Sequence, residues 1–379
     1  MNDIEFITML PTSGDGAYVG VSSAASNKSL SGWTGTADRE PTFEYMTAIA
    51  QVAERVGFGT LLFPVGTGCL DGWVLAGMIA PLTSTIRFMV AVRPGFVLPA
   101  VAARQAATLD YLTGGRLCIN VVTGGSPAEQ AQDGDFADHE ARYRRTFEFI
   151  SVVKQLLLGE VVNHQGEFYQ LQNARLSPRA AQKPFPPFFI AGASPPGKKL
   201  AAEEADTYMM WGETLDNTAK RIADLRAIAD PIGRKLHYSI SFQVILGETE
   251  RDAWDRAWDM LSKVDPSTAN RQVDAFRQAD SVGQLSLAKL MRDSRDSGFK
   301  LGPNLWAGLT QVLSGNSIAL VGTADQVADR VAEYVAQGFD HVLLRGFPHL
   351  EMIERIGVEV LPRIRRRVGP ASPSTSQAK

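Results

Sequence analysis

Residues 89–125 read MVAVRPGFVLPAVAARQAATLDYLTGGRLCINVVTGG, which is the pattern of a strand, a helix and a second strand. An apolar strand ends at Arg93-Pro94-Gly95, and residues 117–122 return as the next strand. A connection that holds a helix is typical of two parallel strands. We expect one face of this helix to pack on the sheet, the face formed by Val101, Ala102, Gln105 and Leu109.

The second of these strands carries polar residues where apolar ones would be ordinary. Asn120 lies inside it, and Thr123-Gly124-Gly125 closes its carboxyl end. Sheets and barrels of the α/β class bind their ligands at this end of the strands. The segment therefore predicts a functional site there.

The same alternation of strand and helix continues along the chain. Apolar stripes with helical spacing occur at Phe43, Met46, Ile49, Ala53 and Val56, and again at Val327, Val331 and Val335. Eight strands are predicted, at about residues 4–10, 59–64, 86–92, 116–122, 187–192, 206–211, 237–246 and 340–344. Eight strands favour an α/β fold of the (β/α)8 TIM-barrel type over the alternative, an open doubly wound sheet.

Three connections are longer than a barrel needs. They follow strands 1, 4 and 7 and cover residues 17–41, 124–139 and 250–320. The first is rich in Ser, Gly, Ala and Thr with Trp33 as its expected anchor, and the first and last of them are candidate lids. We expect a single domain over residues 1–368 and a flexible tail over 369–379.

Composition and charge exclude several classes of protein. Of 379 residues, 45% are hydrophobic and 21% charged, and the formal net charge is −3 with both signs interspersed. Nucleic-acid binding is disfavoured because no basic stripe is present. The first residues lack the pattern of a signal peptide and no window is apolar enough to span a membrane, so we expect a cytoplasmic protein.

Cysteine and histidine usage indicates neither disulfides nor a metal. Cys69 and Cys118 lie in or beside apolar strands, and we expect both to be reduced. The five histidines show neither the HExxH spacing nor clustering with cysteines. No metal site is expected.

A candidate anion site follows the fifth strand. Residues 187–199, PFFIAGASPPGKK, pass from the strand through Gly192, Ala193 and Ser194 into a helix, whose amides and dipole favour an anion. The alternative is structural, with small residues that permit a tight turn and Ser194 as the helix cap. The GxxxxGK[ST] and GxGxxG signatures are absent, so a nucleotide would be held in another way.

Eight short motifs are distributed over residues 6–365. They are PTSGDGAYVG (11–20), AVRPG (91–95), VAARQAATLD (101–110), NVVTG (120–124), DHEARYRRTFEF (138–149), WGE (211–213), PNLWAG (303–308) and GFPHLE (346–351). With these motifs the chain resembles the bacterial-luciferase-like, flavin-dependent monooxygenases, and most closely the alkanesulfonate monooxygenases.

The resemblance implies a TIM barrel that receives reduced FMN from a separate NAD(P)H-dependent FMN reductase and reacts it with O2. It also implies a homodimer or homotetramer. Asn120 would contact the flavin, while Tyr143 and the backbone of Gly192, Ala193 and Ser194 would hold its phosphate.

The implied chemistry requires an apolar pocket from which water is excluded. Trp73 and Trp211 are candidate walls of this pocket, and Cys69 matches the family cysteine near the substrate. Each has an ordinary alternative, because tryptophan is usually a core residue and a lone cysteine a small buried hydrophobe.

The sequence departs from the alkanesulfonate monooxygenases at residues implied to bind substrate. Ser241-Phe242-Gln243 replaces an arginine and a histidine on the seventh strand. Leu313, Phe347 and Ser13 replace an arginine, a tyrosine and a histidine. A sulfonate in a dry pocket needs a cation, so the family's usual recognition cannot operate unchanged.

One cation remains as a compensating candidate. Arg345 either points into the barrel mouth and binds an anion or points outward to a helix carboxylate. His349, at the start of the last helix, is a general acid or base or else only part of that helix start. The candidate catalytic residues are therefore His349, Gln243 and Ser13, and the candidate substrate-binding residues are Cys69, Trp73, Trp211, Ser241, Leu313, Arg345 and Phe347.

These observations favour a two-component monooxygenase that oxidises a small organic molecule, with an organosulfur compound and its C–S bond as the leading class. A sulfone, a sulfonate bound in a new way or another apolar xenobiotic would suit the changed pocket. The alternatives on the same fold are a flavin-binding protein without oxygenase activity and a deazaflavin-dependent dehydrogenase.

Overall fold

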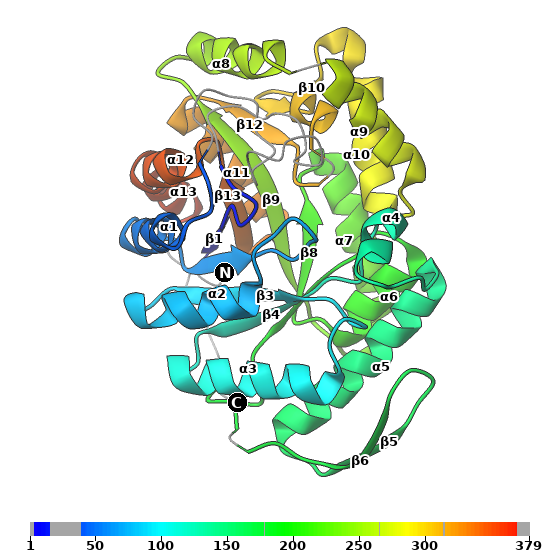
Figure 1. The fold of residues 1–379 in the computed structure, drawn as a ribbon. Helices are drawn as coiled ribbons and strands as arrows, with labels where there is room; N and C mark the ends of the chain where they lie inside the picture. Colours follow the sequence, from blue (N-terminus) through cyan, green and yellow to red (C-terminus); the bar gives the residue numbers. More distant parts are fainter. Residues whose placement is uncertain (1–3, 16–38, 178, 265, 314, 370–379) are drawn as a thin grey trace, which may run out of the picture.

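Eight parallel strands close into a barrel, which confirms the predicted (β/α)8 fold (Figure 1). The computed structural model describes residues 4–15, 39–177, 179–264, 266–313 and 315–369. Around the barrel the strands follow the order β9-β13-β1-β2-β3-β4-β7-β8, and β8 pairs with β9 to close it. Their bounds are Glu5–Met9 (β1), Thr60–Phe63 (β2), Arg87–Val92 (β3), Leu117–Val121 (β4), Phe188–Ala191 (β7), Thr207–Trp211 (β8), His237–Leu246 (β9) and His341–Arg345 (β13).

Helices follow the strands and surround the barrel. The main ones are α1 (Phe43–Arg55), α2 (Gly72–Ile79), α3 (Pro99–Thr113), α5 (His139–Leu158), α6 (Pro195–Glu204), α7 (Leu215–Ala229), α11 (Ala324–Ala336) and α12 (His349–Arg355), which continues through a π-helical turn (Ile356–Val360) into α13 (Leu361–Val368). Two short elements stand outside this scheme, the helix α4 (Pro127–Gln132) and the hairpin β5 (Val162–Gln165) with β6 (Gln170–Ala174). No helix among the described residues is both long and apolar enough to span a membrane.

Side chains fill the inside of the barrel. Its middle layer consists of the buried residues Ile7, Leu62, Met89, Cys118, Phe189 and Leu343. Neighbouring strands keep these residues level, since Ile7 pairs with Leu343 and Leu62 with Met89. Because side chains alternate along a strand, the residues two positions further on also point inward, toward the barrel mouth.

The inner face of α3 differs from the prediction. Ala102 and Leu109 are buried as expected, but Val101 is 38% exposed and Gln105 is also exposed, so both face solvent. Ala103, Ala106 and Ala107 take their place on the barrel side. Small alanines let the helix lie close to the sheet, which hydrophobicity alone does not reveal. Phe43 is likewise exposed, at the first turn of α1, whereas the rest of that stripe is buried or half-buried.

The connection after β9 forms a subdomain at the mouth. It contains α8 (Glu250–Ser262), α9 (Pro266–Gln278), α10 (Val282–Asp293), and the short strands β10 (Lys300–Gly302), β11 (Leu305–Trp306) and β12 (Ala319–Gly322) (Figure 1). The last half of β9 pairs with β12, in the register Gln243 to Ala319. The predicted insertion at 17–41 is described only from residue 39 on, and Trp33 lies outside the described residues, as does the tail after Gly369.

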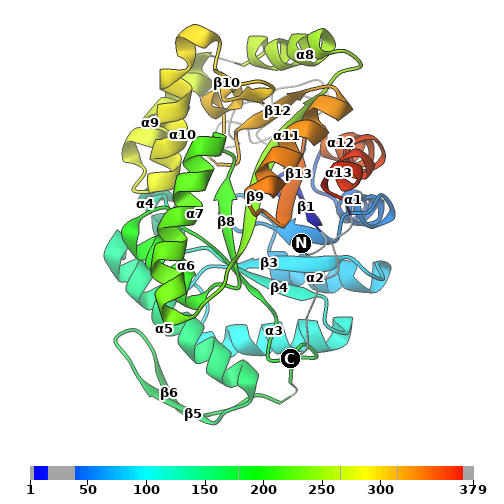
Figure 2. The same ribbon diagram turned by 180° about the vertical axis from the view of Figure 1, so that it is seen from behind.

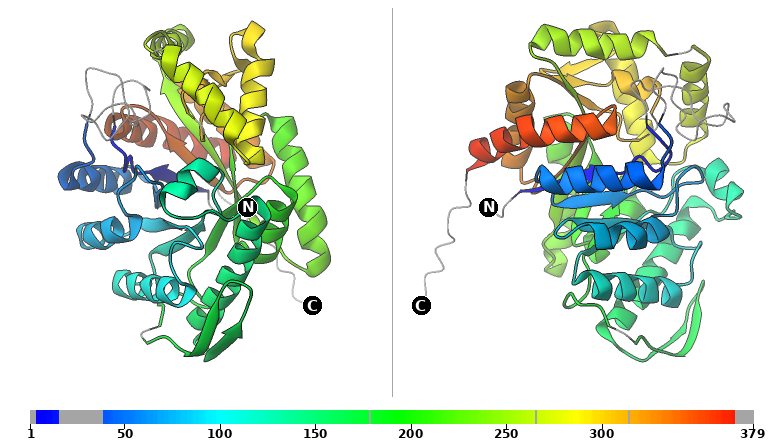
Figure 3. Two further views of the ribbon diagram at one scale, coloured as in Figure 1. Left: turned by 45° about the vertical axis from the view of Figure 1, so that its right-hand side comes forward. Right: turned by 60° about the vertical axis from the view of Figure 1, so that its left-hand side comes forward.

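The first and last helices of the barrel lie side by side (Figures 2 and 3). Arg55 of α1 pairs with Glu354 of α12 at 2.8 Å, and Arg365 of α13 donates to the carbonyl oxygen of Gly57 at 2.9 Å. These contacts bring the segment that follows β1 next to the segment that follows β13. The elements that follow β1 and β13 therefore occupy one sector of the barrel wall.

Candidate functional site

Arg345 points into the barrel, which decides between the two orientations left open by the sequence. It follows the inward-facing Leu343 by two residues and lies level with Gln243 of β9. Arg345 is 9% exposed, its Nη1 lies 3.5 Å from the sulfur of Met9, and no described residue forms a hydrogen bond with its Nε. Burial lowers the pKa of Arg345 to about 10 and the charge of Asp15 opposes this shift, so the guanidinium remains charged at neutral pH.

His349 forms a buried pair with Asp15. Its Nδ1 and its backbone N–H lie 2.7 Å from Oδ1 and Oδ2 of Asp15, and the Tyr45 hydroxyl donates to Oδ2 at 2.5 Å. Burial raises the pKa of Asp15, but the charge and hydrogen bonds of His349 and the bond from Tyr45 outweigh it and lower that pKa. The Nε2 of His349 is buried and has no hydrogen-bond partner in the part of the chain that the structure describes. This arrangement fixes the ring with one nitrogen available to a ligand.

Ser241 and Gln243 lie on the inner face of β9. Ser241 is level with Trp211 of β8, and its hydroxyl lies 3.4 Å from the carbonyl oxygen of Met210. Gln243 is fully buried and donates from Nε2 to the carbonyl oxygen of Asn316 at 2.9 Å, and its Oε1 has no partner among the residues that the structure describes. Neither side chain carries charge, so Arg345 supplies the positive charge of this sector.

An apolar wall flanks Arg345 and His349. The Phe347 ring lies 5.9 Å from the Arg345 guanidinium carbon and 4.9 Å from the His349 ring. Leu313 packs in the same apolar cluster as Phe347, together with Ile245 of β9. Two of the predicted replacement residues, Leu313 and Phe347, thus belong to one cluster.

Trp211 stands between the barrel and the insertion. Methyl groups built on Gly283 or Gly315 would come within 3.2 Å or 3.0 Å of its ring. It is half-buried and packs on the main core, as does Trp73 at the start of α2. Trp211 therefore contacts the candidate lid, whereas the observed contacts of Trp73 are with the core.

Cys69 lies beside a buried ion pair. Arg93 is 5% exposed and pairs with Glu129 at 3.3 Å, and the charges of both residues affect the pKa of the Cys69 thiol. Burial raises the pKa of the Cys69 thiol, and a contact with Thr12 opposes this. The thiol is therefore largely protonated at neutral pH, which does not favour a nucleophilic role.

Tyr143 and Ser194 meet at the carboxyl end of β7. A methyl group on Gly197 or Gly192 would lie 2.8 Å or 3.1 Å from the Tyr143 hydroxyl, which also contacts the Ser194 hydroxyl. Burial raises the pKa of Tyr143, so it is a neutral hydrogen-bond donor. Gly192 has a φ of +152°, and a Cβ there would lie 2.9 Å from the Cα of Gly197. Only glycines allow the strand end and α6 to approach so closely.

The first turn of α6 offers few amides. Ser194 caps the helix by accepting from the Gly197 N–H at 3.3 Å. Pro195 and Pro196 carry no N–H. An anion here would depend on the two hydroxyl groups and on the loop that carries Gly192 and Ala193.

The structure brings most candidates to one end of the barrel. Several buried polar atoms at this end have no hydrogen-bond partner among the described residues, namely Thr123 Oγ1, Gln243 Oε1, Asn316 Oδ1, Arg345 Nε and His349 Nε2. Asn120 also points inward, level with Ala91 and Phe189. Ser13 is half-buried in the turn that closes at Gly14, two residues before Asp15.

Sequence reasoning missed two buried pairs. Asp15 is separated from His349 by 334 positions, and only its place in the GDG of the first motif hinted at a role. Arg142, 2% exposed and next to Tyr143, pairs with Asp280 at 2.5 Å and so ties α5 to the insertion. Long-range pairing of this kind leaves no local pattern.

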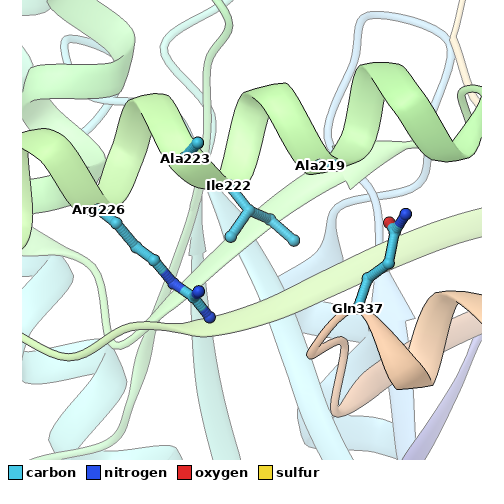
Figure 4. Close-up of a pocket in the computed structure, with 5 residues that line it drawn as sticks. All are labelled: Ala219, Ile222, Ala223, Arg226 and Gln337. Atoms are coloured by element: carbon cyan, nitrogen blue, oxygen red, sulfur yellow. The ribbon is translucent and has the colours of Figure 1, made fainter.

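Two other features lie away from the mouth. A surface hollow is lined by Ala219, Ile222, Ala223 and Arg226 of α7 and by Gln337 after α11 (Figure 4). His237, Asp340 and His341 cluster at the amino ends of β9 and β13, where each histidine Nδ1 already bonds to Asp340. Barrels of this type place catalytic groups at the opposite end.

Comparison with known proteins agrees with the architecture. Residues 20–341 match the family model described as luciferase-like monooxygenase. Three similar solved structures are the EDTA monooxygenase EmoA from Chelativorans sp. BNC1, a riboflavin lyase (RcaE) with modified FMN and riboflavin, and DmoA from Hyphomicrobium sulfonivorans. EmoA is 23% identical with a TM-score of 0.76, over 99% of this chain and 97% of its own. The riboflavin lyase is 19% identical with a TM-score of 0.77, over 97% and 92%. DmoA is 21% identical with a TM-score of 0.73, over 97% and 89%. At these identities the structures support the fold.

Proposed function

The chain belongs to the luciferase-like monooxygenase family, and from this premise we propose that it is a two-component monooxygenase using reduced FMN and O2 on a small organosulfur compound. The observation that carries the proposal is the buried pair of His349 and Asp15 at a barrel mouth walled by apolar side chains. The organosulfur class and oxidation at a C–S bond rest on the motifs shared with alkanesulfonate monooxygenases.

The residues at the end of β7 fit an FMN phosphate. Tyr143 and Ser194 offer adjacent hydroxyl groups, and the loop of Gly192 and Ala193 brings backbone close to them. Thr123 follows the neighbouring strand β4, which carries Asn120, and its buried Oγ1 has no partner among the described residues. When bound, reduced FMN supplies the two electrons that activate dioxygen.

The chain's own residues have three tasks in this proposal. Trp211, Phe347 and Leu313 exclude water from the mouth. Asp15 fixes the orientation of His349, whose Nε2 then gives a proton to, or takes one from, the reacting substrate. Gln243 orients the substrate without exchanging a proton.

The proposal also includes partners. A separate NAD(P)H-dependent FMN reductase would supply the cofactor, and a homodimer or homotetramer would be the working form. In support of a protein contact, exposed apolar side chains follow the outer faces of α2 and α3, namely Val74, Met78, Leu98, Val101 and Leu112. The unpaired thiols of Cys69 and Cys118 are in keeping with a cytoplasmic location.

Coupled turnover tests the proposal. The protein is incubated with FMN, a flavin reductase, NADH and a panel of sulfones and sulfonates, and sulfite or oxidised product is measured. We expect product from at least one compound. Hydrogen peroxide alone with every compound would count against an oxygenase and favour the flavin-binding alternative, and hydride exchange with a reduced deazaflavin would favour the dehydrogenase.

A further inference from the structure

Arg345 differs from the other buried arginines in its surroundings. Arg93 and Arg142 pair with a carboxylate at 3.3 Å and 2.5 Å, and so does the half-buried Arg145 at 2.5 Å. The only polar contact observed for the Arg345 guanidinium among the described residues is with the thioether of Met9. Burial of a charged group without a counter-ion is strongly unfavourable. Such a group is therefore found chiefly at functional sites, where a ligand supplies the opposite charge.

Asp15, the carboxylate that acts electrostatically on Arg345, is already engaged. Its oxygens accept from the ring and backbone of His349 and from Tyr45. Asp15 is therefore the partner of His349, and among the described residues no ion pair joins Asp15 to Arg345.

The position of Arg345 in the barrel separates it from the proposed flavin residues. In the ring of eight strands, β13 is four strands away from β4 in either direction, so Arg345 lies across the mouth from Asn120. The proposed phosphate residues follow β4 and β7, on that far side. A ligand of Arg345 is thus placed on the side opposite the flavin phosphate.

The neighbours of Arg345 define what kind of ligand fits. Phe347, 5.9 Å from the guanidinium carbon, and Met9 are apolar, and the Leu313 cluster continues the apolar surface. A guanidinium matches the two oxygens of a carboxylate or sulfonate, and the apolar surface matches a hydrocarbon body.

We propose that Arg345 binds the anionic group of the substrate, which is a monoanionic organic acid, a sulfonate or a carboxylate, with an apolar body. This inference rests on the proposed function and deepens it. It assigns to β13 the anion recognition that the uncharged Ser241 and Gln243 of β9 cannot provide.

Binding to the flavin-free protein tests the assignment. Calorimetric titration compares sulfonates, carboxylates and neutral alcohols with the same alkyl or aryl groups, on wild type, R345M, R345K and a surface control, R144M, which removes an exposed arginine paired with Glu167. Wild type and R144M should bind at least one anion about tenfold more tightly than its alcohol. R345M should lose this preference, and R345K should keep part of it.

Thermal unfolding gives a second readout that does not require the right ligand. Because R345M removes an uncompensated buried charge, its Tm without ligand should not be lower than that of wild type and should rise by up to about 3 °C. A clear fall in Tm, or no anion preferred over its alcohol in wild type, would overturn the inference. Loss of FMN affinity in R345M with unchanged anion binding would assign Arg345 to the flavin instead. Failure of wild type to bind FMN at all would instead count against the proposed function.

Discussion

The Nδ1 of His349 lies 2.7 Å from Oδ1 of Asp15, although the two residues are 334 positions apart in the sequence. The pair joins the loop after β1 to the start of α12, and β1 is the neighbour of β13 in the barrel. It resembles the orienting carboxylate of other acid–base sites, in which the carboxylate fixes the tautomer of the imidazole.

Substitution D15N should impair turnover without impairing flavin binding. The amide keeps the shape of the side chain but disturbs the hydrogen bonds to His349, and general acid–base catalysis typically contributes about 10²–10⁴-fold. We expect kcat to fall by about 10² in D15N and H349Q. The double variant should lose little more than either single one, and fully additive losses would contradict a shared role. Y45F, which leaves the His349 contact in place, should have a smaller effect.

Substitution Y143F should weaken FMN binding selectively. A hydrogen bond to a charged group is worth about 1.5–3 kcal/mol, so the Kd for FMN should rise about tenfold or more. Riboflavin, which lacks the phosphate, serves as the matched ligand, and its Kd should be unchanged. Equal losses for both flavins would show that Tyr143 acts on the ring system or the fold.

Substitution D280N should loosen the insertion. It leaves the buried Arg142 without its carboxylate partner, and a buried charge that loses its counter-ion is destabilising. Limited proteolysis should cut α9 or α10 faster in D280N than in wild type, and more NADH should be consumed per product formed. R277M, which removes an exposed arginine paired with Asp274, is a control on the same insertion. Unchanged protection in D280N would exclude the Arg142 contact as the clamp.

The cluster at the other end of the barrel should make stability depend on pH. The hydrogen bond that His237 donates to the Asp340 carboxylate raises the pKa of His237 above its usual 6.5. The stability that this bond contributes is therefore full below pH 6.5 and is lost as pH rises through the raised value. Burial opposes ionisation of Asp340, but the bonds to His237 and His341 lower its pKa below 3.8, so its contribution is lost as pH falls through the lowered value. D340N should therefore reduce Tm more at pH 5.5 than at pH 8.5. The His237 part is under about 1 kcal/mol because that side chain is half-exposed.

An equal effect of D340N at both pH values would show that the loss comes from hydrogen bonding alone. D216N, a substitution in the first turn of α7 and outside this cluster, controls for the loss of one surface carboxylate. Its Tm should differ from wild type by a similar, small amount across the pH range.

Much of the fold could be predicted because its signals are local. The strands at residues 86–92 and 116–122 are short apolar runs bounded by turn residues, and the structure places β3 and β4 within them. The inner face of α3 could not be predicted well, because Ala103 and Ala106 carry little hydrophobic signal beside Val101. Small side chains are required where a helix lies close to a sheet, and the position of such a close contact is visible only in the packed structure.

The sequence predicts where the site lies in the barrel better than it predicts which residues contact each other there. Asn120 and Ser194 stand at strand ends, where ligands bind in this fold, and that much follows from the sequence. The inward direction of Arg345 did not follow, because both faces of a barrel strand are buried and alternation cannot tell them apart. The Asp15 and Asp280 pairs depend on contacts between distant segments, which one sequence without structure does not display.

An anaerobic titration of the protein with reduced FMN, with oxidised FMN and a reduced deazaflavin as comparison ligands, measures whether the barrel mouth binds the reduced flavin. We expect one reduced FMN bound per chain, more tightly than the oxidised form and in preference to the deazaflavin. The absence of reduced-FMN binding, or a preference for the deazaflavin, would contradict it.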